Sequence, residues 1–299
     1  MNFETWGLTG SLFTQNDETL PFAEQRLWHW INAVDDACNR FRPDSEISNL
    51  NRVHGEPVAI SETLELALDA ALRASEATGG LCDPTVLPAL LALGYDRDYD
   101  ELATRSIVAK EPVPSPGVDA IDLDRQAHAV TLRPGCQLDL GASAKALVAD
   151  LVADELAFYG GVLVEIGGDV AVRGRGPTGP WVIGISPSLQ LTAREPRIIV
   201  TDSGVATSSS TTRTWRVGGR VVNHIIDPRT GTFAHGAYAC ATVSAVDCVT
   251  ANAFATAALL WGEDAAYYIS QAGWSGRLVR HDDTVEFVGR WPREEESPS

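Results

Sequence analysis

Residues 212–226 read TRTWRVGGRVVNHII, so that two runs rich in β-branched and aromatic residues flank Gly218-Gly219. Two such runs separated by two glycines are typical of a tight β-hairpin, because glycine readily adopts the positive φ angles of the favoured two-residue turns. The end of the chain repeats this arrangement, since Leu278–Arg280 and Thr284–Val288 lie on either side of a polar turn. The sequence therefore predicts antiparallel sheet.

The rest of the chain alternates between strand-like and helical patterns. Ala129–Leu140 is predicted to be a hairpin that turns at Pro134-Gly135, and Val162–Arg173 and Trp181–Ile185 are strand-like. Apolar residues at helical spacing predict long helices and one shorter helix. These helices are expected at Phe22–Asn39, from the N-cap Ser61 to Gly79-Gly80, at Ser143–Tyr159, at Val249–Trp261 and at Asp264–Gln271. Antiparallel strands interrupted by a few helices favour an α+β fold of antiparallel sheets with several packed helices. A Rossmann fold is not indicated, since no GxGxxG motif stands between a strand and a helix.

The size and composition fit a folded domain. The chain has 299 residues, of which 44% are hydrophobic and 21% charged, enough apolar material for a sizeable core. We expect one domain over residues 1–290, or two intimate lobes, and a charged, disordered tail over residues 291–299. The stretch Glu111–Gly117, EPVPSPG, predicts a surface loop that could separate the two lobes.

The charge of the chain limits its partners. A net charge of -17 repels the phosphate backbone of nucleic acids, so general nucleic-acid binding is not expected. An anionic nucleotide would need a metal cation or a local positive group at its site.

The five cysteines form no CxxC pair, which indicates reduced, buried thiols. No stretch is long and apolar enough to span a membrane, and the N-terminus lacks a signal-peptide pattern, so we expect a cytoplasmic protein.

Two glycine-containing segments could bind an anion. In residues 138–145, LDLGASAK, a strand-like run ends at Asp139 and a helix begins, so that free N–H groups and Lys145 could meet a phosphate. The alternative is a capped helix with a solvated lysine. In residues 164–170, VEIGGDV, two glycines inside an apolar strand indicate either a close approach to the backbone or a β-bulge.

Three polar segments nearer the C-terminus could carry chemistry. In residues 223–231, NHIIDPRTG, a strand leads His224 to a turn, where it could act as a base or pack. Asn252 and Thr256 share a helix face and could offer oxygen ligands to Mg²⁺, or could make local hydrogen bonds. The hydroxyl run Thr207–Thr212 could bind phosphate oxygens, although such runs more often form loops or edge strands.

Taken in chain order, these segments resemble the ApbE family of FAD:protein FMN transferases. The likeness runs from about Trp6 to Gly289. It is carried by RFRPDSEISNLN (40–51), TGGLCDPTV (78–86), LDLGASAK (138–145), EIGGD (165–169), VATS (205–208), HIIDPRTG (224–231) and TANAFAT (250–256). The HIIDPRTG and DLGASAK segments together are the most specific part of the resemblance.

The resemblance implies a T-fold-like α+β architecture with a cleft for FAD and Mg²⁺. Position by position in the motifs, it implies that FAD is contacted by Phe41, Leu81, Cys82, Asp83, Asp139, Lys145, Ile225 and Ile226. It implies that Mg²⁺ is held by the carbonyl of Ala142, by Asn252 and by Thr256. The family usually has aspartate where this chain has Asn252, so we expect weaker Mg²⁺ binding. The family's usual lipoprotein signal is absent, which also favours a cytoplasmic protein.

The implied reaction is transfer of FMN from FAD to a threonine of a target protein, with release of AMP. His224 or Asp227 could take the proton of the attacking hydroxyl. The targets of this family carry a D-x-x-[ST]-[GS]-A-T type sequence around the threonine. Two alternatives stay open. The first is a FAD pyrophosphatase that yields free FMN and AMP, and the second is a non-catalytic FAD-binding protein, which Asn252 would favour.

Overall fold

The computed structural model describes residues 1–102, 107–186 and 196–291, and within them the chain forms two compact units. The first unit comprises Met1–Asn32, Lys145–Ser209 and Ala237–Ser299, and the second comprises Ala33–Ala144 and Ser210–Gly236. The loop at residues 111–117 is not the boundary, because the second unit extends on both sides of it. Nearly all of the tail that we expected to be disordered, residues 291–299, lies outside the described residues.

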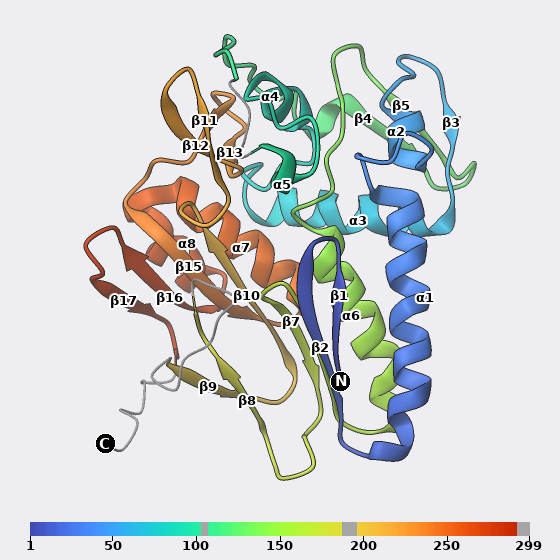
Figure 1. The fold of residues 1–299 in the computed structure, drawn as a ribbon, viewed down its shortest axis with the longest axis vertical. Coiled ribbons are helices and arrows are strands. Elements are labelled where there is room, and N and C mark those ends of the chain that lie inside the picture. The colour runs from blue at the N-terminus through green and yellow to red at the C-terminus, as the bar shows by residue number, and fades with distance from the viewer. Residues whose placement is uncertain (103–106, 187–195, 292–299) are drawn as a thin grey trace. The chain divides into compact units, whose positions relative to one another are not determined.

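The first unit is built on an eight-stranded sheet of order β1-β2-β6-β7-β10-β15-β16-β17 (Figure 1). Each neighbouring pair of its strands is antiparallel. The strands are β1 (Asn2–Thr5), β2 (Leu8–Thr14), β6 (Val162–Ile166), β7 (Asp169–Arg173), β10 (Ser203–Ser209), β15 (Tyr238–Ala245), β16 (Ser275–Arg280) and β17 (Val285–Val288). A separate hairpin joins β8 (Trp181–Gly184) and β9 (Arg197–Val200). Trp181 packs with the buried Trp291 and with residues of β6 and β7.

Helix α7 (Cys248–Trp261) packs along β10 and β15, as Figure 1 shows. It begins at Asp247, whose side chain accepts the Thr250 N–H at 2.7 Å. The first unit also contains α8 (Ala265–Gln271), which packs on β16, and nearly all of α6 (Ala144–Leu156). Short 3₁₀ turns are η1 (Asp17–Thr19), η3 (Ala157–Tyr159) and η4 (Gly262–Asp264). Helix α1 (Leu20–Cys38) starts in the first unit and ends in the second.

The second unit combines short helices with small sheets. Its helices are α2 (Glu46–Leu50), α3 (Glu62–Ala77), α4 (Leu87–Ala92), α5 (Tyr99–Leu102) and the 3₁₀ turn η2 (Val118–Ala120). One sheet has the order β3-β5-β4, from β3 (Val58–Ala59), β5 (Ala129–Leu132) and β4 (Ile121–Asp124). Two hairpins follow, β11 (Thr214–Val217) with β12 (Arg220–Asn223) and β13 (Ile226–Asp227) with β14 (Thr232–Phe233).

Most predicted elements are confirmed. Gly218 and Gly219 form the hairpin turn with φ angles of 55° and 81°, as their sequence indicated. Ser61 caps α3, since its Oγ accepts the Leu64 N–H at 3.2 Å. The antiparallel ladders and packed helices confirm the α+β prediction. Among the helices of the described residues, none combines the length and the apolar character that crossing a bilayer requires.

The hairpin predicted for residues 129–140 is wrong. Strand β5 pairs instead with the preceding β4 and with β3. Residues 137–140 are held by side-chain contacts, since Asn51 accepts the Leu138 N–H at 2.7 Å and donates to the Leu138 carbonyl at 2.9 Å. The backbone groups that a hairpin would pair are therefore bound by an asparagine 87 residues away.

Two local interpretations also change. Gly167 and Gly168 are not inside a strand, because they form the turn between β6 and β7 with φ angles of 60° and 94°. The hydroxyl run that begins at Thr207 lies partly in β10, which is an interior strand between β7 and β15. Both residues that flank the glycine turn, Ile166 and Asp169, are thereby paired with each other across the hairpin.

Candidate functional site

A buried carboxylate joins three elements of the first unit. Asp169 is the first residue of β7, and its side chain is 3% exposed. Its Oδ2 accepts from Lys145 Nζ of α6 at 2.7 Å, and its Oδ1 accepts from Asn252 Nδ2 of α7 at 2.8 Å. The glycine turn makes this possible, since it returns the chain within two residues and directs Asp169 back between the helices. The structure therefore brings the predicted residues Lys145 and Asn252 together.

Hydroxyl groups continue this polar face along α7. Thr256 lies one helical turn after Asn252, and its Oγ1 is 3.0 Å from Ser208 Oγ of β10. Thr207 of the same strand is hydrogen-bonded to Thr242 of β15, at 2.9 Å between their hydroxyl oxygens. We call the set Lys145, Asp169, Ser208, Asn252 and Thr256 the Asp169 cluster. It contains one cation, one anion and three neutral oxygen-bearing groups.

The start of α7 is fixed by a second buried carboxylate. Asp150 of α6 accepts the N–H groups of Cys248 and Val249 through its two oxygens, each at 2.9 Å. Burial raises the pKa of Asp150 to about 6, against the opposing effect of these two hydrogen bonds. Arg173 lies 3.3 Å from Asp150 Oδ1. Since the first turn of a helix has N–H groups without helical partners, Asp150 anchors the helix that carries Asn252 and Thr256.

In the second unit, two predicted cofactor residues share an apolar cluster. Phe41 and Ile226 both belong to the cluster formed around Tyr95 and Trp215. The Phe41 and Tyr95 rings are 5.8 Å apart between centroids, and the Tyr95 and Trp215 rings are 5.2 Å apart. The Arg40 guanidinium lies over the Phe41 ring at 4.1 Å and over the Tyr95 ring at 4.7 Å. This arrangement offers an aromatic surface beside a fixed positive charge.

Asp139 is bound on both of its oxygens. Its Oδ2 forms an ion pair with Arg40, and its Oδ1 accepts the Gly141 N–H at 2.7 Å. Its own N–H donates to the Pro84 carbonyl at 2.8 Å, which ties the 138–145 segment to the 78–86 segment. The carboxylate thus orients Arg40 and shapes the turn toward Ala142, which is exposed. Whether Asp139 also contacts FAD stays a prediction.

The residues of the 78–86 segment that were predicted to contact FAD are buried or form hydrogen bonds with neighbouring residues of the protein. Leu81 and Cys82 are buried, and the Cys82 N–H donates to Thr78 Oγ1 at 3.0 Å. Asp83 accepts the N–H and the hydroxyl of Thr85, both at 2.7 Å, and burial raises the pKa of its carboxyl. Thr85 in turn accepts the Gly117 N–H at 3.1 Å. The segment forms a rigid turn, and its assignment to FAD stays a prediction.

Of the two predicted bases, His224 lies between β12 and β13, and Asp227 is the last residue of β13. Asp227 forms two hydrogen bonds with the Arg229 guanidinium, at 2.9 and 2.8 Å. Burial raises the pKa of Asp227, but the bonds to Arg229 outweigh it, and the pKa lies below its usual value. A paired carboxylate of low pKa is a poor proton acceptor, so His224 is the better of the two candidates. Beside it, Ile225 is buried and donates its N–H to Asn223 Oδ1 at 3.0 Å.

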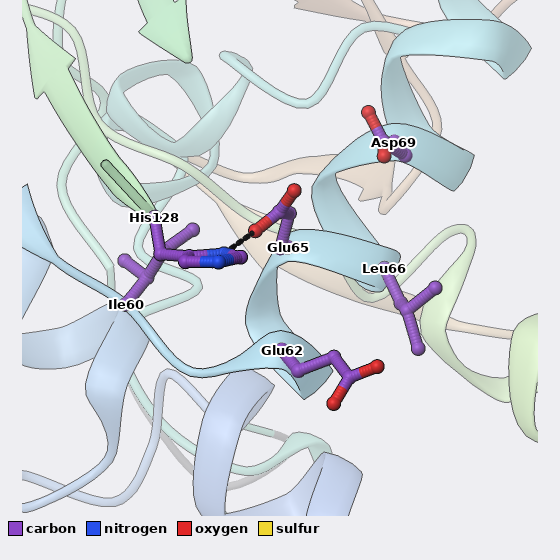
Figure 2. Close-up of a pocket in the computed structure, with 6 residues that line it drawn as sticks. All are labelled: Ile60, Glu62, Glu65, Leu66, Asp69 and His128. Atoms are coloured by element: carbon purple, nitrogen blue, oxygen red, sulfur yellow. Dashed lines mark hydrogen bonds and ion pairs between the residues drawn. The ribbon is translucent and has the colours of Figure 1, made fainter. Parts of the chain in front are cut away.

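One pocket lies elsewhere in the second unit (Figure 2). It has a volume of about 440 Å³ and is lined by Ile60, Glu62, Glu65, Leu66, Asp69 and His128. His128 Nδ1 is 2.6 Å from Glu65 Oε2, and this hydrogen bond raises the pKa of His128. Three carboxylates line the pocket, so it is unsuited to an anionic nucleotide. None of the predicted site residues lines it.

A comparison with known protein families identifies the family of this chain. The family model described as the ApbE family matches residues 7–275. The chain belongs to the ApbE family. The resemblance read from the sequence motifs is therefore confirmed.

Relatives and solved structures agree with this assignment. The FAD:protein FMN transferase of Vibrio cholerae is 28% identical over 255 residues, which cover 81% of this chain and 74% of the relative. That of Chlamydia muridarum is 30% identical over 253 residues, covering 80% and 78%. The ApbE protein of Thermotoga maritima superposes with a TM-score of 0.80 at 23% identity, covering 96% of each chain. The flavin transferase ApbE from Vibrio cholerae gives a TM-score of 0.78 at 24% identity, covering 99% and 98%. These structures confirm the predicted ApbE architecture.

The residues of this ApbE chain fit a hard divalent cation by their chemistry. Asn252 and Thr256 offer an amide and a hydroxyl oxygen, and oxygen donors are what Mg²⁺ prefers. Since Asn252 donates to Asp169 through Nδ2, its Oδ1 is the atom suited to a metal ion. Within the described ranges, there is no group of three or more His, Cys, Asp or Glu side chains that could hold a metal ion. Both side chains predicted to hold Mg²⁺, Asn252 and Thr256, are neutral.

The sequence reasoning missed three residues that organise these clusters. Asp169 joins Lys145 to Asn252, Arg40 joins Asp139 to the aromatic rings, and Asp150 anchors α7. Asp169 closes the EIGGD motif and Arg40 opens the RFRPDSEISNLN motif, so both stood within motifs already recognised. Asp150 had no motif signal, because its role depends on two helices meeting in space.

Proposed function

We propose that this protein transfers FMN from FAD to a threonine hydroxyl of an acceptor protein, releases AMP and depends on Mg²⁺. It belongs to the enzyme class of flavin transferases, the activity by which its curated relatives are named. The observation that carries the proposal is the ion pair between Lys145 and the buried Asp169 at the start of α6. This pair holds an ammonium group in place, and an ammonium group can donate charge-assisted hydrogen bonds to phosphate oxygens.

In the proposed reaction, the threonine oxygen bonds to the phosphorus on the FMN side of FAD. The bond from that phosphorus to the bridging oxygen breaks, and AMP leaves with the bond's electron pair. Lys145 offsets the charge on the phosphates, and His224 takes the proton of the attacking hydroxyl. Phe41 and Ile226 provide apolar surface for a ring of the cofactor. When bound, Mg²⁺ would neutralise pyrophosphate charge, held by Asn252, Thr256 and the carbonyl of Ala142.

The proposed acceptor carries its threonine in a D-x-x-[ST]-[GS]-A-T type sequence. The cytoplasmic location expected from the sequence stays a prediction. Two other functions use the same residues. A FAD pyrophosphatase would replace the threonine by water, and a FAD-binding protein would leave the cofactor intact. The neutral Asn252, hydrogen-bonded to Asp169, is the observation that favours the last of these.

One incubation distinguishes the three functions. The protein is mixed with FAD and Mg²⁺, with and without a peptide bearing the acceptor sequence, and the products are identified by mass spectrometry. The FMN mass on the peptide threonine together with AMP supports the transferase. FMN and AMP without a labelled peptide support the pyrophosphatase, and intact FAD in each tube supports a binding protein.

A pair of variants tests the metal assignment. Thr256→Val removes a predicted ligand oxygen, whereas Thr250→Val makes the same chemical change in the first turn of the same helix. We expect Thr256→Val to slow FAD cleavage at limiting Mg²⁺ and to recover partly at high Mg²⁺. Cleavage by Thr256→Val at the wild-type rate at limiting Mg²⁺ would show that the ligand assignment is wrong.

A further inference from the structure

In the Asp169 cluster, the positive charge of Lys145 balances the negative charge of Asp169 without a metal ion. The Asp169 carboxylate receives the Lys145 ammonium on one oxygen and the Asn252 amide on the other. Ser208 and Thr256 hydrogen-bond to each other and add no charge. The side chain of Asp169 is 3% exposed and that of Lys145 is 19% exposed, so this balance is set largely away from water.

The other charged groups near the cluster have hydrogen-bond partners of their own. Glu165 of β6 interacts electrostatically with Asp169, but its Oε1 accepts the Gly168 N–H at 2.8 Å. Asp150 is bound to the start of α7 and to Arg173. No further carboxylate among the described residues is hydrogen-bonded to Asn252 or Thr256.

Asn252 is the residue on which this balance depends. Its amide donates a hydrogen bond to Asp169, which a carboxylate at the same position could not do. A carboxylate there would place two buried negative charges within hydrogen-bond distance, and like charges so close are relieved either by a shared proton or by a cation between them. With asparagine, the cluster is satisfied before any cation arrives.

We infer that a divalent cation binds this protein only together with the pyrophosphate of FAD, because Asn252 keeps the Asp169 cluster neutral without a metal ion. This inference rests on the proposed function and specifies the order in which its two ligands bind. The protein itself contributes neutral oxygens from Asn252 and Thr256. Affinity for a hard cation rises with the number of charged ligands, so the negative charge has to come from the pyrophosphate. The cluster then binds the cation and FAD together, as a metal–nucleotide complex.

The test compares wild-type protein with Asn252→Asp in the absence of FAD. Mg²⁺ is titrated by calorimetry, and thermal unfolding is followed with a chelator, with Mg²⁺ alone, with FAD alone and with both. For the wild-type protein we expect Mg²⁺ affinity to be at least about tenfold weaker without FAD than with it, and no shift of Tm by Mg²⁺ alone. For Asn252→Asp we expect a lower Tm in chelator than for the wild-type protein. We also expect Mg²⁺ alone to raise the Tm of this variant.

An exchange variant serves as the matched control. Asp169→Asn with Asn252→Asp keeps one carboxylate and one amide and only swaps their places, so we expect no response to Mg²⁺ alone. Wild-type protein that binds Mg²⁺ equally well with and without FAD would overturn the inference, whether or not the variants fold. Failure of FAD to bind would instead contradict the proposed function, while the titrations of Mg²⁺ alone would still test the role of Asn252.

Discussion

Asp150 is expected to make the stability of the first unit depend on pH. Burial raises its pKa from 3.8 to about 6 in the folded protein. The folded state therefore holds this proton more tightly than the unfolded state, so the free energy of unfolding falls as the pH rises from about 3.8 to about 6. Above that window, the ionised carboxylate costs the folded protein about 3 kcal/mol relative to the protonated form.

The perturbation that isolates this effect is Asp150→Asn, which cannot ionise. Asparagine keeps one acceptor oxygen for the first turn of α7 but loses the other, so the variant should be less stable than the wild-type protein at acid pH. Between about pH 5 and about pH 7.5, the wild-type protein should lose about 1.4 kcal/mol relative to the variant. The assay is urea unfolding of both proteins, followed by tryptophan fluorescence, at several pH values across this range.

Asp154→Asn provides the control. Asp154 lies on the same helix and pairs with the same arginine at 2.6 Å, but its side chain is 62% exposed. This variant should follow the pH dependence of the wild-type protein. The reasoning would be refuted if the free energies of unfolding of the wild-type protein and Asp150→Asn differed by the same amount at each pH. It would also be refuted if the wild-type protein gained stability relative to the variant as the pH rises.

Three further measurements test other parts of the structure. Gly231→Ala should cost more than about 3 kcal/mol in the free energy of unfolding, because a Cβ there would lie 2.3 Å from the backbone of Val113 and φ is +71°. Gly219→Ala, with φ of +81° and open space around it, should cost only about 1 kcal/mol, so equal losses in urea would contradict the steric argument. The five cysteines are buried, and burial raises the pKa of Cys82 to about 12, so iodoacetamide at neutral pH should label the native protein far less than the unfolded protein by mass spectrometry. Arg40→Lys should weaken FAD binding by about tenfold in flavin fluorescence titrations, whereas the exposed control Arg52→Lys should not change it.

The strength of local patterns explains which elements could be predicted. The Gly218-Gly219 turn and the Ser61 cap are fixed by neighbouring residues, and both were predicted from sequence. The failure at residues 129–140 has a distant cause, because the Asn51 side chain takes the backbone groups of Leu138. The pairing of β5 with β4 is local, but the turn at residues 125–128 that joins them has no strong turn signal such as paired glycines.

In the candidate site, too, residues related by a local pattern were predicted, and a partner distant in sequence was missed. Asn252 and Thr256 were predicted as one face because they are four residues apart on a helix, and the structure places both in the Asp169 cluster. The partner that connects Asn252 to Lys145 was missed, since Asp169 lies 24 residues after Lys145 and 83 residues before Asn252. Helical periodicity says which residues share a face, but it does not say which carboxylate that face will meet.

The chain passes between its two units four times, since the first unit is assembled from three separate segments. The N-terminal strands β1 and β2 are made first by the ribosome, yet their sheet is completed only by β15, β16 and β17 near the C-terminus. Folding of the first unit must therefore wait until synthesis of the chain is almost finished, while most of the second unit has already left the ribosome. A single proteolytic cut or a C-terminal truncation cannot release either unit as a continuous fragment, so the two units should be lost together during degradation.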